Sequence, residues 1–177
     1  MSELTVRRAE TAEYEAVVEF YYKLIDDMQV FTFHPKWVKG VYPSEEYLSN
    51  AINNGEVYIT LDEGAIAGAM VLNHASNEGY KSASWLTDAT SDEAMVAHTI
   101  GVAADHMRQG IGSRMLHEAI KIAAENGQKS VRLDVLHENL PAKKLYESIG
   151  FHYIKSLHMY YRNTGWCVFD LYEYPLV

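Results

Sequence analysis

A turn marked by two glycines, between a strand and a helix, constrains the fold of this chain most strongly. Residues 94–102 are predicted to form a strand, and Gly110 and Gly112 then open an amphipathic helix over residues 111–126. Residues 130–136 form the next predicted strand. A strand, a helix and a strand in this order make a crossover connection between parallel strands. The centre of the chain therefore predicts an α/β fold.

The remaining segments add strands and helices on both sides of this unit. We expect further strands at residues 4–9, 56–61, 65–73, 151–161 and 167–174, and further helices from Thr11 to about residue 29, from Ser44 to about residue 54 and over residues 141–149. Residues 85–92 favour no element. The last two strands, joined by a turn at residues 163–165, should add antiparallel edges, so the sheet is mixed. A chain of 177 residues suits a single domain, residues 1–177.

Charge and hydropathy narrow the classes of partner. The net charge of −9 argues against nucleic acid, whose phosphates need a basic surface, and against an anionic membrane. It is compatible with a cationic amine as substrate. The first ten residues lack the apolar segment of a signal peptide, and no apolar run is long enough to span a bilayer. We therefore expect a cytoplasmic protein.

The sequence predicts no metal site and no disulfide. Cys167 is the only cysteine, which excludes an intramolecular disulfide and a cysteine-rich zinc site. His117 and Glu118 begin like a metalloprotease helix, but Lys121 stands where the second histidine would be.

The glycine turn has the properties of an anion site. Without side chains, Gly110 and Gly112 let backbone N–H groups face a ligand at the positive end of the helix dipole. A Walker loop would need Lys and Ser/Thr after the glycine, where Ser113 and Arg114 stand, and a dinucleotide fingerprint would need a third glycine at Met115. This motif alone leaves open a tight turn that binds nothing.

A second motif identifies a family. Residues 133–151 read LDVLHENLPAKKLYESIGF. The QGIG turn and the pattern N-x-x-A-x-x-L-Y-E-x-x-G-F together resemble the GCN5-related N-acetyltransferase (GNAT) family, strongly over residues 99–151 and elsewhere by the order of elements. The resemblance implies a GNAT-type mixed, largely antiparallel, twisted sheet of about seven strands with a central parallel pair, flanked by about four helices. It also implies a cofactor-binding core at about residues 94–151 and transfer of an acetyl group from acetyl-CoA, without a metal.

The resemblance also implies which residues hold acetyl-CoA. In this family the backbone of the glycine turn holds the pyrophosphate, the preceding strand pairs with the pantetheine arm, and an asparagine and a tyrosine contact the cofactor. The corresponding residues are Arg108, Gln109, Gly110, Ile111, Gly112 and Ser113 for the turn, Ile100, Gly101 and Val102 for the strand, and Asn139 and Tyr146. Met107 departs from the usual Arg or Gln, so one side-chain contact is lost, whereas the backbone cradle does not depend on it.

Three residues are candidates for proton transfer. Tyr146 matches the family tyrosine that gives a proton to the departing thiolate, although it could instead only pack against the core. Asp134 stands where the ribosomal-protein alanine acetyltransferases have a glutamate that takes the amine proton. It lies between Leu133 and Val135, so its side chain should point to the opposite face of the sheet from these two apolar residues. The alternative for Asp134 is that it orients a backbone or pairs with Arg132. His98, on the strand before the turn, is the rival base because imidazole titrates near neutral pH, and its alternative is a histidine that is only packed and hydrogen-bonded. The sequence leaves open Asp134, His98 or plain water as the proton acceptor.

The acceptor is less constrained than the cofactor. Phe31 and Trp37 lie in an aromatic connector, residues 30–43, where this family builds its acceptor-site wall; a cluster beneath a long loop is the alternative. The last strands carry aromatic residues that suit a dimer face or a second wall: Tyr160, Tyr161, Trp166, Tyr172 and Tyr174. The sequence leaves open a monomer or a homodimer, and a small amine or a peptide or protein N-terminus as acceptor.

Two functions remain to be weighed. The first is an N-acetyltransferase that works by direct attack in a ternary complex, since Cys167 lies far from both motifs and no covalent intermediate is implied. The second is a non-catalytic acetyl-CoA sensor or scaffold. The presence of both Tyr146 and Asn139 favours the enzyme, while Met107 weighs slightly for the sensor.

Overall fold

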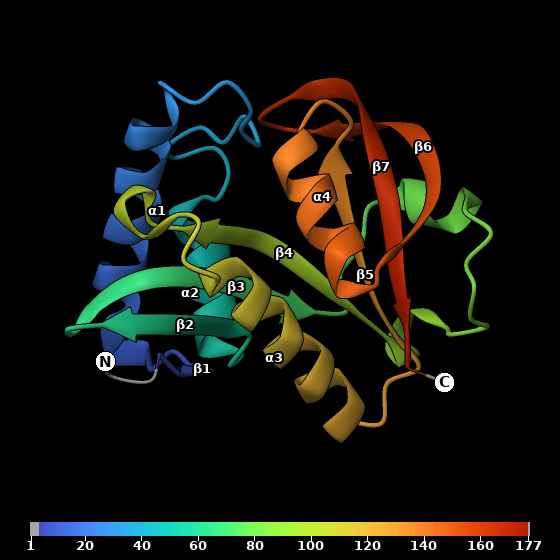
Figure 1. Ribbon diagram of the computed structural model, residues 1–177, viewed down its shortest axis with the longest axis horizontal. Coiled ribbons are helices and arrows are strands. Elements are labelled where there is room, and N and C mark those ends of the chain that lie inside the picture. The colour runs from blue at the N-terminus through green and yellow to red at the C-terminus, as the bar shows by residue number, and fades with distance from the viewer. Residues whose placement is uncertain (1–3, 177) are drawn as a thin grey trace.

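The computed structural model describes residues 4–176, which form one seven-stranded sheet flanked by helices (Figure 1). The strand order is β1-β2-β3-β4-β5-β7-β6, and β4–β5 is the parallel pair among the described strands. The strands are β1 (Val6–Arg8), β2 (Val57–Asp62), β3 (Ala65–Asn73), β4 (Ala94–Val102), β5 (Ser130–Leu136), β6 (His152–Tyr161) and β7 (Gly165–Pro175). The helices are α1 (Tyr14–Met28), α2 (Glu45–Asn53), α3 (Ile111–Glu125) and α4 (Leu140–Ile149). The predicted fold class is confirmed.

The first helix begins later than predicted. Thr11 was expected to cap it, but residues 11–13 form a separate 3-10 turn and α1 begins at Tyr14. The side chain of Glu13 turns back, accepting a hydrogen bond from the backbone N–H of Glu10 at 2.8 Å and pairing with Arg7 at 2.7 Å. The Glu13 carboxylate, on the third residue of the turn, therefore satisfies the backbone N–H of Glu10, the residue that precedes the turn.

The last hairpin is antiparallel as expected, but only one of its strands is an edge. β7 lies between β5 and β6 and pairs with the whole length of β5, from Ser130↔Pro175 to Leu136↔Phe169. This placement buries Leu171 and Tyr172 completely, so Tyr172 does not belong to the exposed aromatic surface predicted for these strands. Tyr160 and Trp166 are exposed, at 53% and 71%.

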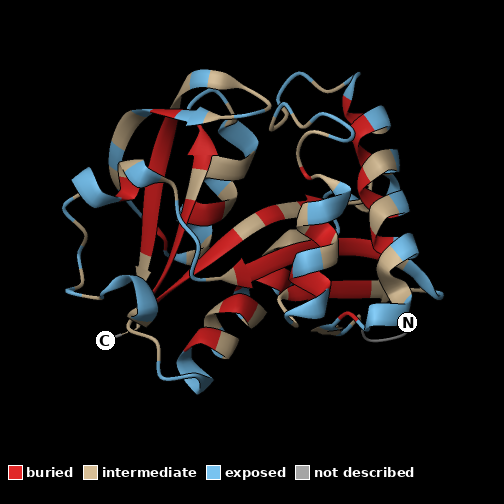
Figure 2. Cartoon of the chain, turned by 180° about the vertical axis from the view of Figure 1, so that it is seen from behind, coloured by how far each residue is buried: buried red, intermediate tan, exposed pale blue. Residues whose placement is uncertain are grey.

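Hydrophobic clusters cover both faces of the sheet. One cluster lies between the sheet and helices α3 and α4, and a second lies between the sheet and helices α1 and α2. Neighbouring residues of β2 and β3 alternate between the two clusters. Figure 2 shows the buried residues along the strands and on the helices. A third cluster, which includes Tyr80, packs against Trp85, the first residue of the segment 85–92 that favoured no element. Arg132 holds this region by stacking on Trp85, at 4.3 Å from the ring centroid, while it pairs with the buried Glu173 at 3.0 Å. Side-chain contacts, rather than periodicity, give this segment its shape.

The two parallel strands separate after a short paired stretch, and this separation positions the site. β4 and β5 pair only from Ala94↔Ser130 to Val96↔Arg132, although both strands continue. Figure 1 shows them diverging from their paired ends, with α3 and α4 in front. A bulge in β4 accompanies the divergence. It is seen as a shift in the register with β3 between His98 and Gly101. Beyond Val96, the edge of β4 that faces β5 is therefore left without a partner strand.

Candidate functional site

A cavity of about 1060 Å³ opens where β4 and β5 diverge. Three parts of the chain line it: the end of β4 with the start of α3, the end of β5 with α4, and the connector after α1 with the β6–β7 turn. The lining includes every predicted cofactor-site residue except Gln109, whose side chain donates to the backbone oxygen of Asp105. It also includes Asp134, Tyr146, His98, Phe31 and Trp37. Segments far apart in the sequence thus meet at one concave surface.

The glycine turn leaves the start of α3 free of side-chain caps. Gly110 is the N-cap residue, with φ of +80°, and makes no side-chain cap, whereas Ser44 caps α2 and Asn139 caps α4. The first N–H groups of a helix need partners from outside the helix. Gly112 has a second role, since a Cβ there would lie 3.1 Å from Leu145 Cδ2. The two glycines therefore give an open helix end and a close approach of α3 to α4.

The bulge in β4 is held by a tyrosine from α1. Thr99 has a φ of +48°, which is unusual for a residue with a branched side chain. The hydroxyl of Tyr21 donates to the Thr99 carbonyl at 2.8 Å, and this tyrosine is fully buried. A Cβ on Gly101 would lie 2.7 Å from Leu24 Cδ2, so α1 also packs tightly on the strand beyond the bulge. The helix thereby fixes the unusual backbone at the cavity wall.

Asp134 is bound by two tyrosines. The hydroxyls of Tyr80 and Tyr161 both donate to Oδ2, at 2.8 and 2.7 Å, while Oδ1 has no hydrogen bond to another residue within 4–176. Burial raises the pKa of Asp134, and the two hydroxyls partly oppose this. Arg132 pairs with Glu173 instead, so the alternative in which Asp134 pairs with Arg132 is wrong.

His98 is held by its own hydrogen bonds. Its Nε2 lies 2.9 Å from Asn73 Oδ1, and the backbone of Ala75 also contacts the ring. Burial lowers the pKa of His98 to about 4, against the weaker effect of Ala75. The imidazole is thus neutral near pH 7 and has at least one nitrogen occupied.

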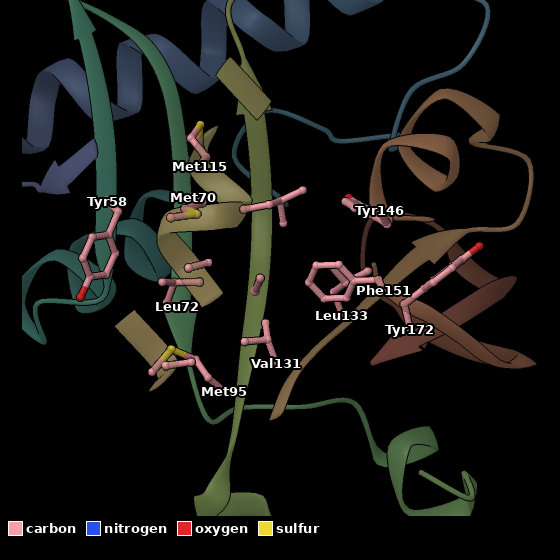
Figure 3. Close-up of a cluster of buried hydrophobic side chains, with 14 of the residues drawn as sticks. Tyr58, Met70, Leu72, Met95, Met115, Val131, Leu133, Tyr146, Phe151 and Tyr172 are labelled. Atoms are coloured by element: carbon pink, nitrogen blue, oxygen red, sulfur yellow. The ribbon is translucent and has the colours of Figure 1, made fainter. Parts of the chain in front are cut away.

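Tyr146 belongs to the hydrophobic core and also lines the cavity. It is the one buried residue of α4, whereas Ala142, Leu145 and Ile149 are half-buried. Figure 3 shows the Tyr146 side chain near Phe151 and Tyr172, whose ring centroids lie 6.1 and 6.0 Å away. Burial, and to a lesser degree the charge of Asp134, raises the pKa of Tyr146. The phenol therefore keeps its proton at neutral pH.

Asn139 has a structural contact as well as a place in the cavity. Its Oδ1 accepts from the backbone N–H of Ala142 at 3.5 Å and caps α4. The amide nitrogen of the same side chain makes no hydrogen bond within residues 4–176.

The aromatic connector meets the β6–β7 turn. Asn163 donates to the Lys36 carbonyl at 3.0 Å, which joins the two segments across the cavity (Figure 1). The Trp37 ring stands edge-on to Tyr21, with centroids 5.8 Å apart, so the wall is braced by the residue that holds the bulge.

Some partners of the site residues were not predicted from the sequence. Tyr161 lines the cavity, as a residue of the second wall would. Tyr80 and Tyr161 lie 54 and 27 residues from Asp134 in sequence, however, and no local pattern predicts their hydrogen bonds to its carboxylate. His106 belongs to the short 3-10 turn after β4 and pairs with Asp62 at 2.9 Å and Asp105 at 2.7 Å. The fold alone brings these groups together.

Within residues 4–176, no group of three or more His, Cys, Asp and Glu side chains is arranged to hold a metal ion. None of the helices in the described part of the chain has the length and apolar character needed to cross a membrane.

Known proteins resemble this chain in sequence and in fold. The sequence matches the acetyltransferase (GNAT) family over residues 18–151. The [ribosomal protein bS18]-alanine N-acetyltransferase of Escherichia coli (strain K12) is 33% identical over 98 residues, which cover 55% of this chain and 66% of that protein. The chain thus spans just under two thirds of the length of this relative.

Solved structures give the same picture. A GNAT-family acetyltransferase from Streptococcus agalactiae 2603 has a TM-score of 0.80 at 16% identity, covering 99% of this chain and 97% of that one. The Salmonella typhimurium protein yncA, solved with its cofactor acetyl-CoA, has a TM-score of 0.69 at 16% identity, covering 99% and 95%. The Escherichia coli ribosomal-protein-S18-alanine N-acetyltransferase has a TM-score of 0.68 at 21% identity, covering 98% and 94%. At these identities the likeness concerns the fold. Since the family match covers most of the sequence and the fold agrees with it, this chain belongs to the GNAT family of acetyltransferases.

Proposed function

We propose that this protein transfers the acetyl group of acetyl-CoA to a primary amine, by direct attack of the amine while both substrates are bound. One observation carries the proposal. The open start of α3, the carboxylate of Asp134 and the hydroxyl-bearing Tyr146 line a single cavity. An anion site, a proton acceptor and a proton donor are the groups that acetyl transfer requires.

The glycine turn fits a pyrophosphate. The N–H groups of the first turn of α3 lack a side-chain cap, and no acidic residue lies in that turn to repel an anion. Arg108, with φ of +62°, lines the cavity beside them. The unpaired edge of β4 over residues 100–102 supports main-chain pairing with the pantetheine arm, and the free amide nitrogen of Asn139 supports a further contact.

Tyr146 and Asp134 are the proposed acid and base. When bound, acetyl-CoA supplies a thioester whose carbonyl carbon is open to attack by a neutral amine. Oδ1 of Asp134 is free to accept the amine proton, directly or through a water, and its raised pKa makes it a better base than an exposed aspartate. Tyr146 holds a proton that it can give to the departing thiolate.

His98 is a weaker candidate than Asp134. Its ring is already bound by Asn73 and by the backbone of Ala75, and a pKa near 4 leaves it little tendency to accept a proton. We assign it the role of a wall residue that supports the β4 bulge.

The acceptor is a small amine or the N-terminus of a peptide or protein. The Escherichia coli relative named for bS18-alanine acetylation supports a protein N-terminus in general terms. The aromatic connector supports a small molecule, because Phe31 and Trp37 line the same cavity as Asp134.

Thiol release from acetyl-CoA tests the proposal. Wild type, Tyr146→Phe and Tyr160→Phe are compared over a panel of amines, amino acids and short peptides, with acetyl-CoA binding measured by calorimetry. Tyr160 is exposed on β6 and controls for loss of a tyrosine hydroxyl. We expect turnover in wild type and Tyr160→Phe, and a fall of about 100-fold in kcat for Tyr146→Phe. Tight acetyl-CoA binding without thiol release for any amine would refute the enzyme and favour the sensor.

A further inference from the structure

The acceptor end of the cavity carries almost no charge. Among the Asp, Glu, Lys and Arg side chains of residues 4–176, Arg108 and Asp134 are the two that line the cavity. Arg108 belongs to the glycine turn. The wall away from the turn therefore presents one carboxylate and no Lys or Arg. This contrasts with the chain as a whole, which has 24 acidic residues and a net charge of −9.

That wall is instead apolar and aromatic. Six of its residues come from the connector, β7 and the end of α1: Met28, Phe31, Phe33, Trp37, Tyr42 and Phe169. Phe33 is 41% exposed, so apolar surface faces solvent beside the cavity. Such surface gains most by burying an apolar group of matching size.

The polar side chains on this wall are largely engaged by their own main chain. His34 Nδ1 accepts from the N–H of Lys36 at 3.1 Å, and Asn163 donates to the Lys36 carbonyl at 3.0 Å. Thr164 Oγ1 donates to the Gly165 carbonyl at 3.0 Å. A peptide backbone bound here would leave some of its amide groups without partners, which costs binding energy.

From these contacts, and resting on the proposed function, we infer that the acceptor is a primary monoamine with an uncharged, apolar body of about aromatic size. Asp134 faces the single amine, and the aromatic wall contacts the body. A polyamine would bring further ammonium groups against a wall that has no carboxylate for them. A free amino acid would bring a carboxylate against a wall without Lys or Arg.

The direct test compares acceptors at saturating acetyl-CoA and constant pH. The panel is 2-phenylethylamine, spermidine, phenylalanine and a hexapeptide with a free N-terminal alanine. We expect kcat/KM for 2-phenylethylamine to exceed that of each other acceptor by about tenfold or more. A higher kcat/KM for spermidine, phenylalanine or the peptide would overturn the inference while leaving the acetyltransferase proposal intact.

Binding separates this inference from the proposed function. Calorimetry measures binding of 2-phenylethylamine and spermidine to the protein saturated with coenzyme A. Preferential binding of 2-phenylethylamine without turnover would support the inference and refute the proposed activity. Binding of neither amine, or a preference for spermidine, would overturn the inference.

Two variants locate the specificity. Phe33→Ala should raise KM for 2-phenylethylamine several-fold and leave KM for propylamine nearly unchanged, since only the longer body reaches Phe33.

Thr32→Asp adds a second carboxylate to the wall and should improve kcat/KM for 1,4-diaminobutane relative to butylamine by several-fold. Val30→Asp is the matched control, because Val30 is 86% exposed and does not line the cavity. Equal responses of Thr32→Asp and Val30→Asp would contradict the assigned wall.

Discussion

The residue that most clearly links structure to chemistry is Asp134. Its two oxygens differ, because Tyr80 and Tyr161 both donate to Oδ2 and leave Oδ1 to the cavity. A carboxylate held in this way has a fixed orientation at the cavity wall. The tyrosines act as positioning residues, and their hydroxyls lower the pKa of the carboxyl group against the larger raising effect of burial.

Removal of one of these hydroxyls should move the pH profile. The Tyr161 hydroxyl lowers the pKa of Asp134 against the larger raising effect of burial. In Tyr161→Phe the pKa of Asp134 therefore rises, and the base stays protonated up to a higher pH. We predict that the acidic limb of kcat/KM shifts to higher pH. Tyr160→Phe, one residue away and exposed, should show the wild-type profile; a shift in both variants, or in neither, would argue against Asp134 as the base.

His106 should make stability depend on pH. The hydrogen bonds that His106 donates to Asp62 and to Asp105 raise its pKa above the ordinary value of 6.5, against the lowering effect of burial. A raised folded-state pKa contributes stability that is complete below about pH 6.5 and is lost as pH rises through the folded value. The free energy of unfolding of wild type should therefore fall from pH 6 to pH 8 by more than that of His106→Gln. Urea titrations at both pH values measure this difference.

The matched control for that experiment is His117→Gln. His117 is exposed on α3 and has no ion pair within residues 4–176. This variant should keep the wild-type dependence on pH. If His106→Gln and His117→Gln behave alike, the clamp of His106 by Asp62 and Asp105 does not contribute to stability.

At the scale of elements, the approach of α3 to α4 depends on Gly112. A Cβ at this position would lie 3.1 Å from Leu145 Cδ2, so Gly112→Ala forces the helices or the leucine to shift. We predict a lower Tm and a several-fold weaker binding of acetyl-CoA. Leu145→Val makes room for the added methyl group, so the double variant should recover part of both losses. Additive losses in the double variant would show that the contact with Leu145 is not the cause.

The elements also show what the sequence could predict. The bounds of β3, β4 and β5 agree with those expected. The start of α1 and the order of β7 and β6 were not foreseen, since both are decided by partners distant in sequence or by a competing carboxylate. The same limit applies to the site. Family motifs predicted where Asn139 and Tyr146 would lie, whereas Tyr80 reaches Asp134 only through the tertiary fold.

At the scale of the whole molecule, the site is a gap between two halves of one sheet. β4 and β5 are joined by only a few residue pairs, and the bond from Asn163 to the Lys36 carbonyl joins the halves again on the far side of the cavity. Asn163→Ala removes this second connection. We predict a higher KM for the amine with little change in acetyl-CoA affinity, measured by steady-state kinetics and calorimetry. An unchanged KM would show that the connector keeps its place without Asn163.

The stoichiometry of the reaction tests the proposed transfer of an acetyl group to an amine most directly. Wild type is incubated with acetyl-CoA and 2-phenylethylamine, and released thiol and acetylated amine are measured in the same samples, by absorbance and by mass spectrometry. We predict one acetylated amine for each thiol released, with both products strongly reduced in Tyr146→Phe. Thiol release without acetylated 2-phenylethylamine, or no product despite bound acetyl-CoA, would contradict acetyl transfer to this amine.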